Sequence, residues 1–318
     1  AQVYARVGHV PEALQLLATA GELVRADETA PAWALVAIDA ERLNLMAPRV
    51  PDRQQFAASV DKVAAAASAL PPTPTAVGVV VKMSALLCAL GAARRAERYA
   101  ERVVALTGRV PEGVGARFQA QLVLADALLA AEGPESALVA QQAAIDTMAP
   151  LGPSPMLGWA YRGLAVHLRT LDRHAEAAEA FGRASDTYRE AGILADAAAL
   201  HVEQAEALLH ADRVEEATAL AQSVLDGLDD VPEANRAVVA LQANRVQALL
   251  AAAEGDLDGA AEHWLEVAEL APTVGRSDLE ARLTAAQLYA ADGDDAEADA
   301  QFLRAELSAA EEPDPARA

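Results

Sequence analysis

Several kinds of residue and segment are scarce in this 318-residue chain, and each scarcity excludes a class of protein. Aromatic residues make up only 4% of the sequence, although 53% is hydrophobic. The one cysteine, Cys88, excludes a disulfide within the chain, and no neighbouring base or positive cluster would lower its thiol pKa. The longest apolar run, residues 76–90, contains Lys82 and is too short to span a bilayer. We therefore interpret Cys88 as a buried inert thiol and expect no membrane-spanning segment.

Motifs of catalysis and cofactor binding are also missing. The sequence has no phosphate-binding loop, no dinucleotide-binding glycine motif, and no zinc-protease, serine-hydrolase or paired-cysteine motif. No two of the six histidines stand three or four residues apart, the spacing that places two metal ligands on one helix face. The acidic run at 292–295 lacks the full ligand set of a calcium loop, and we interpret it as a helix cap. We expect no catalytic residue, no cofactor and no metal site.

Positive charge is scarce as well, since the formal net charge is −22 and Lys62 and Lys82 are the only lysines. Binding to phosphates depends on clustered Lys and Arg, so the sequence predicts no direct binding to nucleic acid and none to anionic membrane surfaces. No signal peptide is visible. The preference for Arg over Lys, with abundant Ala, Val and Gly, is typical of a GC-rich bacterial genome. We expect a cytoplasmic bacterial protein.

What the chain has in abundance is alanine, and the alanines are periodic. In the stretch HAEAAEAFGRASDTYREAG, residues 174–192, a small–x3–large–x2–small pattern places Ala177, Phe181 and Ala184. The same spacing recurs along the chain, with an average step of about 40 residues. Its first members stand at positions 13, 57, 96, 137, 177, 217, 260 and 298. Such a steady period predicts a repeat architecture.

A second small residue stands twelve positions before the first member in seven of the eight units, and Leu45 is the exception. Two small residues separated by a turn are what two antiparallel helices need in order to cross closely. The turn between them contains a glycine in five units, and Leu-Asp-Arg-His or Ala-Asp-Arg-Val in two others. Glycine just past a helix end adopts the left-handed backbone conformation without strain. We therefore expect each unit to be two antiparallel helices joined by a tight turn. The turn glycines are Gly8, Gly91, Gly133, Gly255 and Gly293.

This pattern resembles the tetratricopeptide repeat family, whose units have a small residue, a bulky residue three later, and then Ala–x3–aromatic–x2–Ala in the second helix. The residues that match it best are Tyr161, Leu164, Ala165, Leu168, Ala177, Phe181 and Ala184. The resemblance implies an all-α fold: a right-handed α-solenoid of about eight antiparallel helix pairs, in one array over residues 1–310. The acidic, proline-containing tail at 311–318 is expected to be disordered.

The period departs from that of the family, which is about 34 residues. The spacing across the tight turn is unchanged, so we expect the additional residues at the far ends of the helices. Arrays of such elongated units resemble the sensory parts of large bacterial transcriptional activators and signalling ATPases. The chain also begins in the middle of a repeat, so we expect it to be a piece of a longer protein.

In the tetratricopeptide repeat family, partners contact mainly the first helix of each pair, three positions before, one after and four after the small residue. In the central part of this chain these positions are largely aliphatic, but they also hold the three arginines Arg162, Arg169 and Arg245. The resemblance therefore implies a concave binding groove, to which Trp159 adds an aromatic side chain. Its candidate residues are Trp159, Arg162, Val166, Arg169, Val202, Glu206, Arg245 and Leu249.

We expect the groove to bind a protein or peptide, with apolar contacts and arginines that anchor a carboxylate. Two alternatives stay open. The arginines could instead pair with acids of the chain itself, such as Glu203, Glu206 or Glu254. The groove could also hold a small molecule or the protein's own effector domain, as a sensing or autoinhibitory part of an activator or ATPase. None of these roles is enzymatic.

Overall fold

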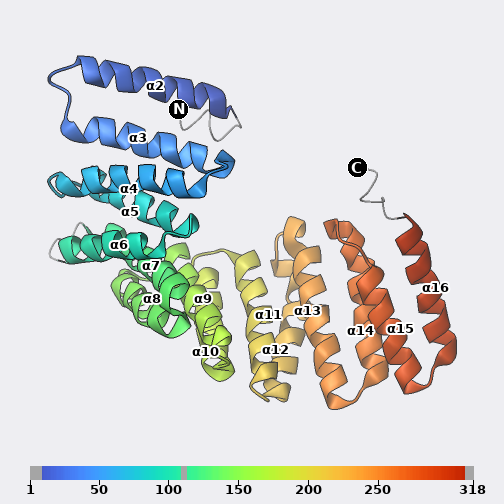
Figure 1. Cartoon of the computed structure of the whole chain (residues 1–318). Helices are drawn as coiled ribbons and strands as arrows, with labels where there is room; N and C mark the ends of the chain where they lie inside the picture. The colour runs from blue at the N-terminus through green and yellow to red at the C-terminus, as the bar shows by residue number, and fades with distance from the viewer. Residues whose placement is uncertain (1–8, 109–112, 312–318) are drawn as a thin grey trace. The chain divides into compact units, whose positions relative to one another are not determined.

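The structure is a computed structural model that describes residues 9–108 and 113–311. Within these residues it consists of α-helices and short 3-10 helices, without a β-strand. The chain divides into two compact units, Ala1–Gly152 and Pro153–Ala318. In each unit, helices that follow one another in sequence pack against one another, as Figure 1 shows. The predicted all-α repeat fold is therefore confirmed.

The first unit contains three of the expected helix pairs, α3/α4, α5/α6 and α7/α8, preceded by α2 as the second helix of another pair. The half-helix expected at 1–7 lies outside the described residues. The helices are α2 (Val10–Ala26), α3 (Ala32–Met46), α4 (Arg53–Ala69), α5 (Pro74–Ala89), α6 (Ala93–Thr107), α7 (Val114–Glu132) and α8 (Pro134–Met148). By length and composition alone α7 could cross a membrane, and in this structure it packs between α6 and α8.

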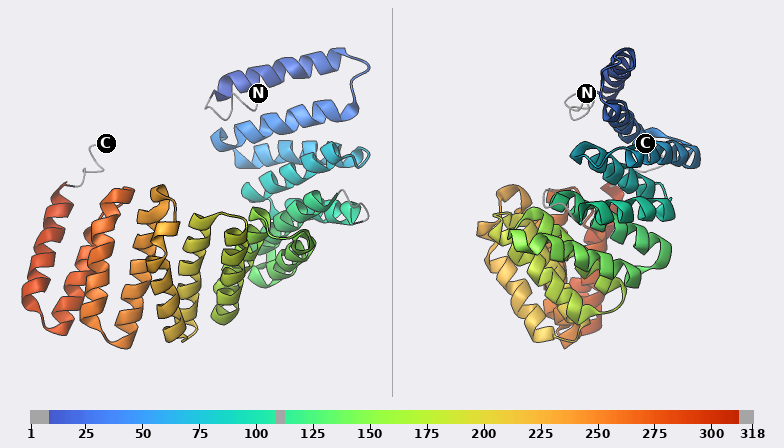
Figure 2. Two further views of the ribbon diagram at one scale, coloured as in Figure 1. Left: turned by 180° about the vertical axis from the view of Figure 1, so that it is seen from behind. Right: turned by 90° about the vertical axis from the view of Figure 1, so that its left-hand side faces the viewer.

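The second unit contains four pairs, and consecutive helices lie side by side in Figures 1 and 2. They are α9 (Pro155–Thr170), α10 (His174–Glu190), α11 (Leu194–His210), α12 (Val214–Asp226), α13 (Glu233–Glu254), α14 (Leu257–Leu270), α15 (Leu279–Asp292) and α16 (Asp295–Glu311). The predicted tail at 311–318 contributes Glu311 to the end of α16, and the rest of it lies outside the described residues.

The small residues found in the sequence lie at the helix contacts. All eight alanines that begin the second-helix pattern are at most 5% exposed: Ala13, Ala57, Ala96, Ala137, Ala177, Ala217, Ala260 and Ala298. In the first helices of the six regular pairs, the small position is fully buried in each case: Ser84, Ala125, Ala165, Ala205, Ala248 and Ala286. A side chain of one carbon lets two backbones approach closely, so the alanine content follows from the number of crossings.

One backbone position in each tight turn takes a positive φ, which favours glycine. In the pairs α9/α10 and α11/α12 this position is held by Asp172 and Asp212, with φ of 56° and 57°. These are the two Asp-Arg stretches that the sequence placed in turns. In the other regular pairs the position is a glycine: Gly91, Gly133, Gly255 and Gly293. The helix that follows the last turn is capped as predicted, since the Asp294 side chain accepts a hydrogen bond from the Glu297 backbone N–H at 3.1 Å.

The additional residues of the long repeat lie where the sequence placed them in three pairs. Short 3-10 helices follow the second helices α8, α12 and α14, at Ala149–Leu151, Leu228–Asp230 and Ala271–Val274. The pair α3/α4 is different, because its 3-10 helix, Ala47–Arg49, stands inside the pair. This longer connection explains why Leu45 fits the repeat pattern poorly and is only half-buried.

Candidate partner-binding groove

The predicted groove residues lie on the first helices of three consecutive pairs in the second unit, α9, α11 and α13. Helices α11 and α13 pack against each other directly, and side chains of α9 reach α11. Each first helix therefore has the next first helix as its neighbour on one surface. The structure brings Arg162, Arg169, Glu206 and Arg245 onto this surface, and it adds Glu203.

Glu203 on α11 joins the two arginines of α9. Its Oε1 accepts hydrogen bonds from Arg162 Nε at 3.3 Å and from Arg162 Nη2 at 3.1 Å. Its Oε2 lies 3.7 Å from Arg169 Nη1. The side chain of Glu203 is 24% exposed, whereas those of Arg162 and Arg169 are 49% and 36% exposed. One carboxylate thus serves two guanidinium groups, which leaves the cluster with a net positive charge and free donor atoms.

A second ion pair joins α11 to α13. Arg245 Nη2 lies 3.3 Å from both carboxylate oxygens of Glu206. Glu203 and Glu206 are two of the acids that the sequence offered as local partners of the groove arginines, and the structure places them in that role. Glu254, the third, forms no ion pair among the described residues. The arginines of these pairs are 36–49% exposed, so solvent screens the pairs and each contributes at most about 1 kcal/mol to stability.

The apolar candidates differ in exposure. Trp159 is 51% exposed and Leu249 is 36% exposed, so both offer surface to a partner. Val166 is half-buried. Val202, at 3% exposure, packs inside the unit and offers almost none. Val202 stands at the same repeat position as Arg162 and Arg245. The short valine side chain ends within the contact between the helices, whereas an arginine side chain is long enough to reach solvent.

Two contacts fix the helix that carries most of the candidates. A Cβ atom added to Gly158 of α9 would stand 2.8 Å from the ring of Tyr188, so the α9–α10 contact needs a glycine. Burial raises the pKa of the Tyr188 hydroxyl, and the nearby Arg162 partly opposes the shift. At the other end of α9, the Arg169 guanidinium lies over the buried Phe181 ring, 5.4 Å from its centroid.

Beside Arg245 the surface is hollowed. A pocket of about 460 Å³ lies between α13 and α15, with Arg245, Trp264, Arg276 and Glu280 in its wall. Arg276 forms no ion pair among the described residues. The repeat pattern does not indicate Arg276, because this residue stands in the connection before α15 and not at a repeat position of a first helix. The one signal in the sequence is that an isolated basic residue stands in an acidic segment.

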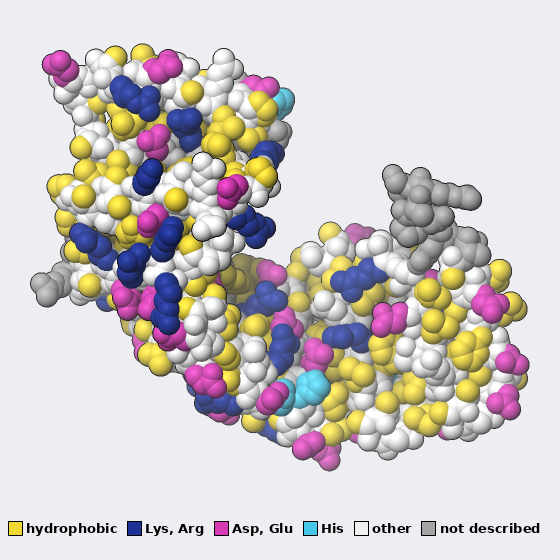
Figure 3. Space-filling model, in the orientation of Figure 1, with side chains coloured by type: hydrophobic (Ala, Val, Ile, Leu, Met, Phe, Trp, Pro, Cys, Tyr) yellow, Lys and Arg dark blue, Asp and Glu magenta, His cyan; other side chains and the backbone are white. Residues whose placement is uncertain are grey.

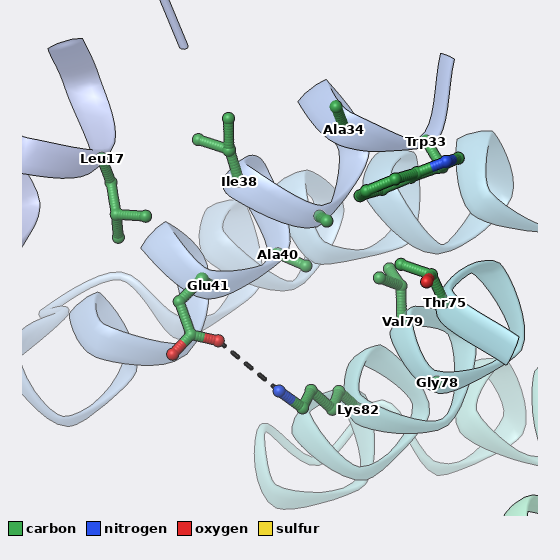
Figure 4. Close-up of a pocket in the computed structure, with 11 residues that line it drawn as sticks. Leu17, Trp33, Ala34, Ile38, Ala40, Glu41, Thr75, Gly78, Val79 and Lys82 are labelled. Carbon is green, nitrogen blue, oxygen red and sulfur yellow. Dashed lines mark ion pairs between the residues drawn. The ribbon is translucent and has the colours of Figure 1, made fainter. Parts of the chain in front are cut away.

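A larger hollow, of about 720 Å³, lies in the first unit between α2, α3 and α5. Figure 4 shows Leu17, Ile38 and Trp33 around it, with Glu41 of α3 directed toward Lys82 of α5. The Glu41 carboxylate lies 3.5 Å from Lys82 Nζ. This pair crosses between neighbouring first helices as Arg162 and Glu203 do. The sequence did not indicate the hollow, because it depends on how far apart the helices stand.

Charge is divided unequally between the units. The first unit has 13 basic and 15 acidic residues, for a net charge of −2. The second has 12 basic and 32 acidic residues, for a net charge of −20. Figure 3 shows Lys and Arg side chains gathered on one face of the first unit. Net charge therefore disfavours phosphate-bearing partners for the second unit but not for the first.

The groups that could perform chemistry are few. Burial raises the pKa of the Cys88 thiol, and the charge of Asp126 raises it further, which agrees with an inert cysteine. Burial also raises the pKa of the Asp126 carboxyl. Among residues 9–108 and 113–311, no three His, Cys, Asp or Glu side chains are placed to hold a metal ion.

Comparison with known proteins gives the fold. No protein family and no curated protein matches the sequence. The solved apo form of RapI is similar, with a TM-score of 0.63 and 12% identity over 88% of this chain and 78% of that chain. BtubC (BKLC) from P. vanneervenii has a TM-score of 0.52 and 22% identity over 70% of this chain and 95% of that one.

A third similar structure is larger than this chain. It is a Signal Transduction ATPase with Numerous Domains (STAND) protein with a tetratricopeptide repeat sensor, from Pyrococcus horikoshii. The match covers 96% of this chain and 40% of that protein, with a TM-score of 0.54 and 14% identity. With the buried alanine pattern and the helix pairs, these likenesses show that the chain has the tetratricopeptide-repeat type of fold.

Proposed function

We propose that the second unit binds a peptide or protein segment along the first helices α9, α11 and α13, without catalysis. The observation that carries the proposal is the combination of exposed Trp159 and Leu249 with arginines that only two acids neutralise. Tryptophan and arginine are enriched at protein interfaces relative to the rest of the surface, so an exposed tryptophan beside arginines favours a binding surface. Arginines with free donors anchor carboxylates of a partner.

The proposed partner has apolar residues for Trp159 and Leu249 and at least one carboxylate for Arg162 and Arg169. A partner carboxylate has to share these guanidinium groups with Glu203, which holds them in place before binding. Arginines held in place lose less conformational freedom on binding than free ones do. On this view the ion pairs preorganise the groove, whereas on the alternative view they only join neighbouring helices.

A selection from displayed random peptides tests the proposal although the natural partner is unidentified. We expect the wild-type protein to enrich peptides that combine acidic and bulky apolar residues. Arg162→Glu should remove this enrichment, because it reverses the charge between Trp159 and Arg169.

The matched control is Arg183→Glu. Arg183 is an exposed arginine on α10, and it forms no ion pair among the described residues. The Arg183→Glu variant should enrich the same peptides as the wild type. Failure of the wild type to enrich any peptide, or equal enrichment by Arg162→Glu, would contradict the proposed site.

The finer proposal is that the array is the sensory part of a larger regulatory protein of the bacterial cytoplasm. The STAND protein supports it, because its match to this chain takes up 40% of a protein that also carries an ATPase. The alternative, in which the groove holds a small molecule or the protein's own effector domain, predicts that no short peptide binds the second unit. The same selection therefore separates the two.

A further inference from the structure

The hollow of the first unit differs from the groove of the second because its walls are mostly apolar. Leu17 of α2, Trp33 and Ile38 of α3 and Val79 of α5 surround it, as Figure 4 shows. Its volume of about 720 Å³ is within the range of pockets that hold ligands, which is roughly 300–1,000 Å³. Trp33 is 41% exposed, so part of an aromatic surface stands open at the hollow.

Gly78 is one of the residues that line the hollow. It stands inside α5, where glycine weakens a helix relative to alanine. A Cβ atom added to Gly78 would meet no atom within 4 Å, so packing does not require a glycine there. Gly158 is the opposite case, since Tyr188 fills the space beside it. Gly78 thus weakens its helix and leaves free the space that a ligand would occupy.

The polar part of the wall has one donor and one acceptor side by side. Lys82 Nζ lies 3.5 Å from Glu41 Oε2, and the side chains are 56% and 18% exposed. An ammonium group only donates hydrogen bonds, and a carboxylate only accepts them. A ligand with a net charge would satisfy one of the two groups and be repelled by the other. An amide satisfies both, because its carbonyl accepts from Lys82 and its N–H donates to Glu41.

From this geometry we infer that the hollow is a binding pocket for a bulky apolar residue of a peptide. The side chain enters between Trp33, Ile38 and Leu17, and the adjoining backbone amide lies across Glu41 and Lys82. The inference rests on the proposed function in taking a peptide as the partner. It concerns other residues in the other unit, so variants of Arg162 and variants of Gly78 test the two claims separately.

Nuclear magnetic resonance can detect this binding, because the chain has three tryptophans and three isoleucines. Trp33 and Ile38 line the hollow, whereas Trp159, Trp264, Ile145 and Ile193 do not. The protein would carry fluorinated tryptophan and labelled isoleucine methyl groups. N-acetyl-leucinamide would be the probe. We expect saturable shifts of the Trp33 and Ile38 signals and none for Ile145.

Variants that fill the hollow give the decisive comparison. Gly78→Phe should weaken binding of the probe at least about fivefold, because the added ring takes the place of the leucine side chain. Thr75→Phe fills the hollow from an exposed position and should weaken binding in the same way. This second variant keeps the test valid if Gly78→Phe does not fold. Val139→Phe adds the same ring to an exposed site on α8 and should leave binding unchanged.

Two charged relatives of the probe test the polar part of the pocket. Leucinamide is cationic and N-acetyl-leucine is anionic, and both should bind more weakly than the neutral N-acetyl-leucinamide. The inference is overturned if Trp33 and Ile38 do not respond, if Gly78→Phe and Thr75→Phe bind as well as the wild type, or if a charged relative binds as tightly as the neutral probe. A loss of peptide binding in Arg162→Glu alone would leave this pocket unaffected.

Discussion

At the scale of single residues, alanine and glycine matter because their side chains are small or absent and leave space for a neighbouring helix or a ligand. Ala177 is fully buried between helices, and Ala175, two residues earlier on the same helix, is exposed. The sequence predicted the role of Ala177 from spacing alone, because a small residue that recurs at a fixed period indicates a close helix crossing in every unit. It could not distinguish Gly78 from Gly158, since the difference between an open space and a Tyr188 ring depends on the neighbouring helix.

The first prediction concerns Ala177→Leu. We expect it to lower the free energy of unfolding by about 1–3 kcal/mol, because three additional carbons must fit into a closed helix contact. Ala175→Leu is the matched control and should change stability by less than about 0.5 kcal/mol. Chemical denaturation of both variants measures the difference. Equal stability of the two variants would show that the repeat register is wrong.

The second prediction compares two glycines of the first helices. Gly158→Ala should destabilise the protein by roughly 1–3 kcal/mol, because its Cβ would stand 2.8 Å from the Tyr188 ring. Gly78→Ala should stabilise it by about 0.5–1 kcal/mol, because a helix gains an alanine and no atom lies within 4 Å of the new carbon. Thermal melts of the two variants should therefore shift in opposite directions. A loss of stability in Gly78→Ala would mean that the space beside it is filled.

At the scale of helices, the pairs, the turns and the position of the additional residues followed from the sequence. The exposed face of the last helix, α16, did not follow from the sequence. Phe302 stands at the large position of the small–x3–large–x2–small pattern, but its side chain is 36% exposed, and Leu303 and Leu307 on the same helix are 59% exposed each. Ala298, Gln301 and Ala305 are buried in their place. The contact with α15 is close enough for small residues, so the bulky ones lie on the outer face.

The groove shows the same limit of prediction. The repeat positions identified Arg162, Arg169, Glu206 and Arg245, which the structure places on neighbouring first helices. They could not show that Val202 turns inward or that Glu203 bridges two arginines, because both depend on how closely α9 and α11 approach. A basic residue in a connection between helices, such as Arg276, has no repeat position and so escapes such a pattern.

At the scale of the whole molecule, the two units differ in charge by 18 although they share one repeat. A single net charge conceals this difference. Counting the two halves of the sequence separately already shows it, because no charged residue stands between positions 152 and 160.

The third prediction concerns pH and belongs to the second unit as a whole. Burial lowers the pKa of His167. Burial and then the charge of Arg189 lower the pKa of His201, and Asp186 partly opposes this shift. When the pH falls through about 6.5, the unfolded chain binds a proton at each histidine, whereas the folded chain does so only at lower pH. Stability should therefore decrease from about pH 7.5 to about pH 5.5.

Denaturation at the two pH values measures this effect. The double variant His167→Gln, His201→Gln should show a smaller decrease, and the exposed-site control His9→Gln should behave as the wild type does. Equal or greater stability of the wild type at the lower pH would contradict the lowered pKa values of buried His167 and half-buried His201.

The most direct test of the proposed groove is the affinity of one selected acidic peptide for the wild type, Arg162→Glu and Glu203→Gln. If the groove arginines bind a partner carboxylate, the two variants should act in opposite directions. Arg162→Glu should weaken binding by about tenfold or more, which corresponds to about 1.4 kcal/mol. Glu203→Gln should strengthen binding, because the amide oxygen can still accept hydrogen bonds from Arg162 and hold it in place, while the negative charge that competes for Arg162 and Arg169 is removed. Unchanged affinity in both variants would show that these ion pairs only join helices.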